Sequence, residues 1–236
     1  PALDTRIVAV VGTLSKRFIM IKIEESMAKT ATHFYIIRHG ETEWNKIGRM
    51  QGHADSPLTP AGIAQAETKA QKLAQVAFDF VYSSDLGRAI QTAQIIAKPH
   101  GKQVIPKTEF REVSCGEYDG LNVKIYTDQF HEQHEVRHKL SYEDSVHFRL
   151  HPSFETIFET AERMRLALLD LHQTHAGKTV AVISHGAVIR NFLIQQLRVH
   201  EADLPYNCIE NTAHIHVELA EEFLVVETDG VNLTKS

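Results

Sequence analysis

The sequence predicts an α/β fold in which a mostly parallel central sheet is flanked by helices in a three-layer sandwich. From His33 onward, short apolar segments alternate with longer amphipathic ones. Neither internal repeats nor low-complexity linkers divide the chain, and 236 residues with 43% hydrophobic content suit one core. Since Met27 lies just ahead of the first strong strand, we expect one domain over residues 27–236 and an extension of unknown role over residues 1–26.

The first half of the domain should contain two strand–loop–helix units. The apolar run at 34–37 predicts a buried strand, and the Thr-Pro pair at 59–60 supplies an N-cap and first position for an amphipathic helix. A second strand is expected at 80–82. It precedes a helix that begins near Gly87 and is apolar on one face.

The second half repeats this pattern. A long helix is expected over 153–177, with the final glycine as its C-cap, followed by a strand at 180–183. A further helix should begin near Gly186. The segments 213–219 and 223–226 predict a terminal pair of strands near a sheet edge.

Composition excludes several classes of protein. The net charge of −5 argues against a nucleic-acid partner, and no apolar run approaches the ~18 residues of a membrane span. The two cysteines, Cys115 and Cys208, form no C-x-x-C pair, so we expect reduced thiols and a cytoplasmic location. The sequence does not indicate an oligomeric state.

Four polar clusters directly follow predicted apolar segments. In open α/β sheets, ligands bind beyond the carboxyl ends of the strands, so these clusters are candidate site residues. They are Arg-His-Gly-Glu at 38–41, Ser-Ser-Asp-Leu-Gly-Arg at 83–88, Arg-Glu at 111–112 and Ser-His-Gly at 184–186. Their histidines, arginines and carboxylate suit phosphoryl transfer, in which positive charge stabilises the phosphoryl oxygens while a nucleophile attacks in line.

The same clusters carry a family resemblance. Residues 38–45, Arg-His-Gly-Glu-Thr-Glu-Trp-Asn, resemble the signature of the histidine phosphatase superfamily, the phosphoglycerate mutase-like enzymes. Residues 83–93 are similar to its second block, Glu112 with Gly116 to its third, and 184–186 to its last. All four occur in family order, and the resemblance covers roughly residues 32–219.

The resemblance implies a role for each matching residue. His39 would be phosphorylated, and Glu112 would be the proton donor and acceptor. The phosphoryl oxygens would be held by Arg38, Arg88 and His185. Arginine supplies planar donor forks that fit such oxygens.

Further contacts to the phosphoryl group are implied for Asn45 and Gln51. The helix that opens at Gly186 should offer free backbone N–H groups to an anion. Because arginines and this helix terminus supply positive charge, the site needs neither a metal ion nor another cofactor. The expected partner is a small phosphorylated substrate.

Each of these residues also has an ordinary structural interpretation. A histidine after a strand is usually a partly exposed loop residue, and an arginine usually forms a surface ion pair. Glu112 could simply pair with Arg111, and Glu109 or Glu117 could be the proton donor instead. The agreement of the four clusters favours the catalytic interpretation.

A histidine-rich segment lies between residues 131 and 151. His131, His134 and His138 would share one side of a helix, which makes a metal site conceivable, but no carboxylate or cysteine completes a convincing set. We interpret them as a solvated face. Residues 124–152 are expected to form an insertion that caps the active site, and the sequence leaves open whether this cap also contacts substrate.

Among functions, hydrolysis of phosphomonoesters is favoured. In the phosphoglycerate mutase branch the catalytic glutamate is typically followed by Arg and, one residue later, Tyr, whereas Val113, Ser114 and Cys115 follow Glu112 here. A 2,3-bisphosphoglycerate-dependent phosphoglycerate mutase is the alternative. A non-catalytic phospholigand-binding protein is disfavoured because the nucleophile and proton donor are intact.

Overall fold

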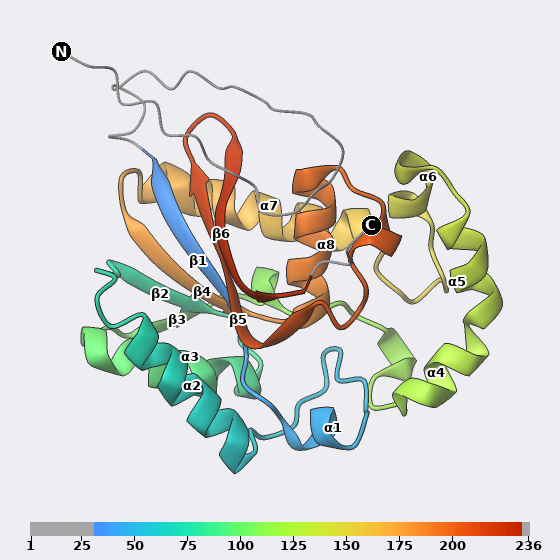
Figure 1. Ribbon diagram of the computed structural model, residues 1–236, viewed down its shortest axis with the longest axis horizontal. Helices are drawn as coiled ribbons and strands as arrows, with labels where there is room; N and C mark the ends of the chain where they lie inside the picture. The colour runs from blue at the N-terminus through green and yellow to red at the C-terminus, as the bar shows by residue number, and fades with distance from the viewer. Residues whose placement is uncertain (1–30, 233–236) are drawn as a thin grey trace.

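A computed structural model describes residues 31–232 (Figure 1). The expectation for residues 1–26 lies outside them. One six-stranded sheet has the order β3-β2-β4-β1-β5-β6. The strands are β1 (Thr32–Arg38), β2 (Phe80–Ser83), β3 (Val104–Pro106), β4 (Thr179–Ser184), β5 (Ile209–Leu219) and β6 (Phe223–Val231).

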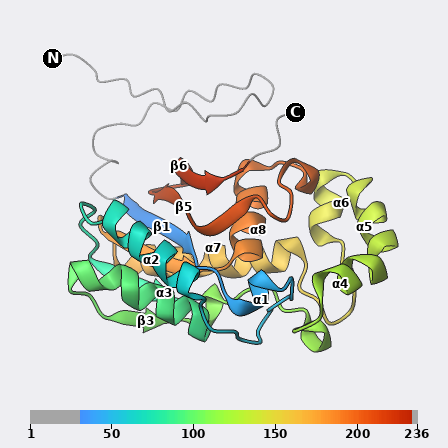
Figure 2. The ribbon, with the colours of Figure 1, turned by 60° about the horizontal axis from the view of Figure 1, so that its bottom comes forward.

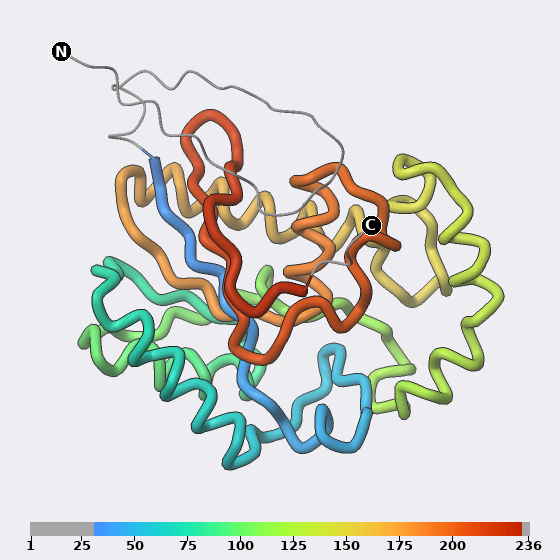
Figure 3. Tube along the Cα trace, viewed as in Figure 1, coloured from blue at the N-terminus to red at the C-terminus, as the bar shows by residue number. Residues whose placement is uncertain are grey.

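Four neighbouring strands of the sheet pair in parallel, and the other two join it through antiparallel pairings. β3, β2, β4 and β1 pair in parallel, while β5 pairs antiparallel with β1 and β6 pairs antiparallel with β5. Figure 3 shows β1, in blue, between β4 and β5. The predicted mostly parallel sheet is therefore confirmed, and its antiparallel edge is formed by the predicted terminal strand pair.

Helices cover both faces of the sheet (Figure 1). One face packs against α2 (Pro60–Lys72) and α3 (Gly87–Ala97), and the other packs against α7 (Ile157–Thr174) and α8 (Gly186–Leu197). Side chains of β1 point alternately to the two faces of the sheet and so contribute to both cores. Phe34 and Ile36 belong to the core under α7 and α8, whereas Ile37 belongs to the core under α2 and α3. The three-layer sandwich is confirmed.

The remaining helices are short. Three of them, α4 (Val123–Gln129), α5 (His131–His138) and α6 (Tyr142–His147), gather at one end of the molecule in Figures 1 and 2. The others are α1 (Glu43–Lys46), η1 (Lys98–His100), η2 (Thr108–Phe110), η3 (Gly116–Tyr118) and η4 (Glu201–Asp203). In residues 31–232 no helix has the length and apolar character to cross a lipid bilayer.

The prediction for the long helix was wrong at both ends. α7 begins at Ile157 because Thr156 forms a capping box with Glu159, so the chain before it is not helical. It ends at Thr174 with His175 as C-cap, and Gly177, with φ +75, belongs to the following turn. The terminal strands are also longer than predicted.

Candidate active site

The parallel strands bring the predicted clusters to one edge of the sheet. Arg38, the last residue of β1, lies opposite Ser184 of β4, and Ser83 of β2 lies opposite Ile183. His39 and His185 directly follow these strand ends, and their ring centroids are 5.2 Å apart. The two histidines that lie far apart in the sequence therefore share one buried site.

The hydrogen bond of His39 to Gly40 determines which of its ring nitrogens carries the proton. Its Nδ1 lies 2.7 Å from the carbonyl oxygen of Gly40. A carbonyl can only accept, so Nδ1 carries the proton and donates it. In the neutral ring, Nε2 is therefore unprotonated and has a lone pair for in-line attack.

His185 has the complementary tautomer. Arg88 donates a hydrogen bond from Nε to His185 Nδ1 over 3.2 Å. Because an arginine nitrogen can only donate, the proton of the neutral His185 ring is on Nε2. That Nε2 is buried and has no hydrogen-bond partner among the described residues. An unpaired buried donor is costly, and a phosphoryl oxygen would satisfy it.

Both rings are held in the neutral form. Burial lowers the pKa of His39 well below 6.5, and the nearby charges of Arg88 and Arg38 lower it further. Burial also lowers the pKa of His185 well below 6.5, with the Arg88 charge as the next cause. The positive charges that would bind a phosphoryl group thus also keep the predicted nucleophile, His39, unprotonated.

This lowered pKa predicts the acid side of the pH profile. A histidine with an ordinary pKa of about 6.5 would be about three-quarters protonated at pH 6. Because the His39 pKa lies well below that value, we expect kcat/KM to fall less than about twofold from pH 7 to pH 6, once substrate ionisation is taken into account. The measurement uses phosphomonoesters with different phosphate pKa values. An acid limb near 6.5 common to all of them would contradict it.

Arg38 is placed over the start of α8. Its Nη1 donates to the carbonyl oxygen of Ile209 over 2.5 Å, and its Nε is buried without a partner among the described residues. A Cβ at position 186 would come within 3.1 Å of this Nε. Gly186 therefore leaves the space that lets the guanidinium lie against the helix terminus.

Arg88 is more heavily engaged than predicted. Its guanidinium donates to His185, to the carbonyl oxygens of Gly52 and Ala54, and to Asp55. These four bonds use four of the five N–H groups of an arginine. Asp55 also accepts from the Arg88 backbone N–H, so a carboxylate outside the sequence motif fixes the start of α3. Its direct contact with phosphoryl oxygens stays a prediction.

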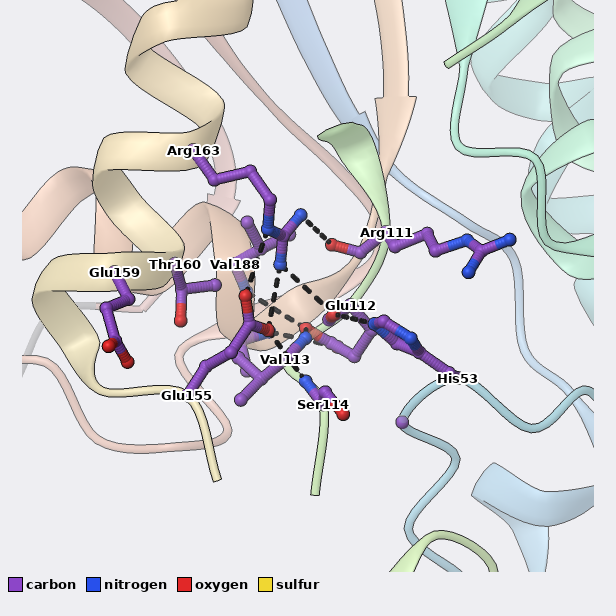
Figure 4. Close-up of polar contacts among 12 residues, drawn as sticks. His53, Arg111, Glu112, Val113, Ser114, Glu155, Glu159, Thr160, Arg163 and Val188 are labelled. Carbon is purple, nitrogen blue, oxygen red and sulfur yellow. Dashed lines mark hydrogen bonds and ion pairs between the residues drawn. The ribbon is translucent and has the colours of Figure 1, made fainter. Parts of the chain in front are cut away.

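The carboxylate of Glu112 lies at the N-terminus of α8 (Figure 4). Its Oε2 accepts from the N–H of Ala187 over 3.2 Å, and its Oε1 accepts from the N–H groups of Val188 and Val113 over 3.0 and 2.9 Å. We expected this helix terminus to offer free N–H groups to an anion. Instead, the N–H groups of Ala187 and Val188 orient the predicted proton donor and are not free, while a substrate contact at Gly186 stays a prediction.

The competing interpretations of Glu112 do not match this geometry. Arg111 pairs with Asp85, at distances of 2.7 and 2.5 Å, and not with Glu112. Glu117 is exposed, and the carboxylate of the half-buried Glu109 accepts a hydrogen bond from its neighbour Thr108. Of the three carboxylates considered, Glu112 is thus the one fixed beside the strand ends.

An ion pair that the sequence did not indicate supports the Glu112 loop (Figure 4). Arg163 on α7 donates to the backbone carbonyls of Glu109, Arg111 and Glu112, and it pairs with Glu155 at 3.0 Å. Glu155 in turn accepts from the N–H of Ser114 over 2.8 Å. No strand-end pattern marks these residues, so sequence reasoning missed them.

The two further candidates differ in their surroundings. Asn45 Oδ1 accepts from Thr42 and, at 3.5 Å, from Asn211, which leaves its NH₂ group as the half that can donate to a ligand. Gln51 is buried, and its Oε1 has no partner among the described residues. Asn211, which was not predicted, also donates to the carbonyl oxygen of His39 over 3.2 Å.

The histidine cluster on α5 does not form a metal site in this arrangement. His134 Nδ1 lies 3.3 Å from Arg137, and His138 lies 3.6 Å from Glu201. A positive guanidinium against a ligand atom opposes cation binding. Among residues 31–232, the group whose donor atoms converge is a different one, at β1 and β5.

Comparison with known proteins places this fold and site in a family. The sequence matches the histidine phosphatase superfamily (branch 1) over residues 34–230, and the chain therefore belongs to this superfamily of enzymes. Probable phosphoglycerate mutase GpmB of Photorhabdus laumondii is 36% identical over 155 residues, which cover 66% of this chain and 70% of that protein. The corresponding protein of Serratia proteamaculans is 37% identical over the same coverage.

Solved structures show the same architecture. Phosphoserine phosphatase of Entamoeba histolytica, in complex with 3-phosphoglyceric acid, is 29% identical with a TM-score of 0.67 over 84% of this chain and 96% of that one. Phosphoglycerate mutase from Bacillus anthracis, at 23% identity, has a TM-score of 0.74 over 88% and 96%. The latter likeness concerns the fold alone.

Proposed function

We propose that this chain is a phosphomonoester hydrolase that acts through a phosphohistidine on His39. The observation that carries the proposal is the pair of tautomers: an unprotonated Nε2 on His39 beside an unpaired Nε2–H donor on His185. The His39 nitrogen would be the nucleophile, and the His185 N–H would donate to the oxygens of the phosphoryl group that His39 attacks. Arg38, whose guanidinium lies against the N-terminus of α8 at Gly186, adds positive charge to this site.

The reaction follows in two steps. His39 Nε2 attacks phosphorus and forms an N–P bond, while the bond from phosphorus to the leaving oxygen breaks and protonated Glu112 gives that oxygen its proton. Water then attacks the phosphoryl group, Glu112 takes a proton from it, the N–P bond breaks and inorganic phosphate leaves. His39 returns to its neutral form, which its lowered pKa favours.

Residues 124–152 are proposed to cap this site. Tyr126 and Phe130 of the segment pack with Phe154 and with Cys115, which lies three residues beyond Glu112. At the other side, Arg137 pairs with the buried Glu201 at 2.6 Å. The segment is thus anchored both to the Glu112 loop and to the region after α8, where it can contact the non-phosphoryl part of a substrate.

Mutase activity is the second candidate, because the matched relatives include proteins named probable phosphoglycerate mutase. The residues after Glu112 oppose it: Val113 and Cys115 stand where that branch has Arg and Tyr, and Cys115 is buried and uncharged. Without these anchors, an acid released from the pocket is not retained, and water becomes the acceptor. We therefore favour hydrolysis of a small substrate. A cytoplasmic location is proposed from the two free cysteines.

Product analysis distinguishes the two candidates. With 3-phosphoglycerate and catalytic 2,3-bisphosphoglycerate, we expect little interconversion to 2-phosphoglycerate, while a panel of other phosphomonoesters releases phosphate. Free phosphate and isomerised product are measured in the same reactions at fixed enzyme. Interconversion that depends on bisphosphoglycerate and outpaces hydrolysis would identify a mutase.

Activity is expected to survive exhaustive chelation. Arg38, Arg88 and His185 supply the charge and the donors that metal ions supply in other phosphatases. Initial rates measured at 25 °C before and after dialysis against a chelator should agree within about twofold. A loss that added zinc or magnesium restores would show that a metal ion takes part in catalysis.

A further inference from the structure

Three side chains on β1 and β5 converge at the end of the sheet opposite the active site. His33 of β1 lies opposite Glu218 of β5, and His216 is the next residue of β5 on the same face. This is the face that α2 and α3 cover further along β1. Here the three residues are only half-buried, so solvent and ions can reach them.

The distances between their donor atoms match those of a bound transition metal. His33 Nδ1 lies 3.2 Å from His216 Nε2 and 3.4 Å from Glu218 Oε1, and all three atoms lie within 4.8 Å of one another. Zn²⁺ binds His nitrogen and carboxylate oxygen at about 2.0–2.2 Å, so two ligand atoms of a tetrahedral site are about 3.3 Å apart. Two of the three distances already have this value, and rotation of the Glu218 carboxylate would adjust the third.

We propose that His33, His216 and Glu218 form a binding site for Zn²⁺. Two imidazoles and one carboxylate are a donor set that zinc prefers. Glu227 of β6 lies opposite His216, so this carboxylate or a water molecule would complete the tetrahedron. The His216 ring stacks on Tyr35 with centroids 4.4 Å apart, which restricts the ring before an ion arrives.

The ion would act on stability and not on the reaction. His33 lies near the start of β1 and His39 follows its end, a separation of roughly 20 Å along an extended strand. Zinc would join β1 directly to β5, where the parallel part of the sheet meets its antiparallel edge. This site does not rest on the proposed function, and loss of zinc should leave the rate of phosphate release unchanged.

The alternative is that His33, His216 and Glu218 bind no metal ion, and that His33 only forms a hydrogen bond with His216 beside the Glu218 carboxylate. Binding measurements on the untagged full-length chain separate the two. Zinc is titrated against a chromophoric zinc chelator, and the melting temperature is recorded over a range of zinc concentrations. A ligand that binds only the folded protein raises the melting temperature progressively.

The variants are His216→Gln, His33→Gln and Glu218→Gln, with the double variant H131Q/H138Q as the control for the histidines of α5. We expect one zinc per native chain. Each site substitution should weaken zinc binding at least about tenfold and abolish the zinc-dependent rise in melting temperature. The α5 control should bind zinc like the native protein. Far-ultraviolet circular dichroism without zinc checks that each variant is folded.

Three results would overturn the proposal: no zinc-dependent rise for the native chain, native affinity in both histidine variants, or loss of binding in the α5 control alone. Should one histidine variant fail to fold, the other and Glu218→Gln still decide the matter. Phosphate release at 25 °C is measured in parallel. If the native protein binds zinc but releases no phosphate from any phosphomonoester, the proposed function is contradicted and the zinc site is not.

Discussion

Replacement of His39 by alanine is expected to lower kcat/KM for every phosphomonoester by at least about 10⁴-fold. The reason is geometric as well as chemical. His39 Nε2 is the unprotonated ring nitrogen at this buried strand end, since the Nδ1 of His185 accepts from Arg88 and its Nε2 carries a proton. With His39 removed, His185 in this tautomer cannot become the nucleophile without breaking its bond to Arg88.

A covalent intermediate gives the second readout for His39. Native enzyme quenched soon after addition of a labelled substrate should retain phosphate in an acid-labile, base-stable form, and the alanine variant should retain none. The matched control is His100→Gln, which changes a half-buried histidine of η1 outside the proposed cap and should behave like the native enzyme in both assays. Undiminished turnover in His39→Ala would end the phosphohistidine mechanism.

The meeting of the candidate site residues could be predicted because one simple rule places them. Polar residues that follow parallel strands meet at one sheet edge, so His39 and His185 come together although 146 positions separate them in the sequence. The strands themselves were visible as short apolar runs. The pairing order of the strands and the tautomers of the two histidines could not be predicted, because both depend on partners that only the folded chain brings near.

The supporting residues could not be predicted for the same reason. Asp55, which holds Arg88, and the pair Glu155–Arg163, which holds the Glu112 loop, follow no strand and form no spaced motif. Each acts through backbone groups or a distant partner, and a charged residue in a loop is usually solvated. The predicted helix started too early because Phe154 fits the apolar stripe of α7 in the sequence, whereas its side chain packs with Phe130 and Tyr126 instead.

Substitution of Glu112 by glutamine should separate proton transfer from phosphoryl positioning. An alkyl phosphate has a poor leaving group, whose oxygen must be protonated as its bond to phosphorus breaks. Its turnover should therefore fall by about 10²- to 10⁴-fold. A nitrophenyl phosphate needs little protonation, so the first step on that substrate should slow by less than about tenfold. The measurement is single-turnover transfer to His39 for both substrates.

The surroundings of Glu112 determine the controls. Its carboxylate accepts from three backbone N–H groups, and a glutamine has only one acceptor oxygen to replace two. A glutamine could therefore also move the start of α8, which would slow both substrates equally. Glu117→Gln, a change in an exposed carboxylate of the same loop, should leave both rates near native values. Equal losses for the two substrates in Glu112→Gln, with a lowered melting temperature, would assign Glu112 to the structure of α8 and not to proton transfer.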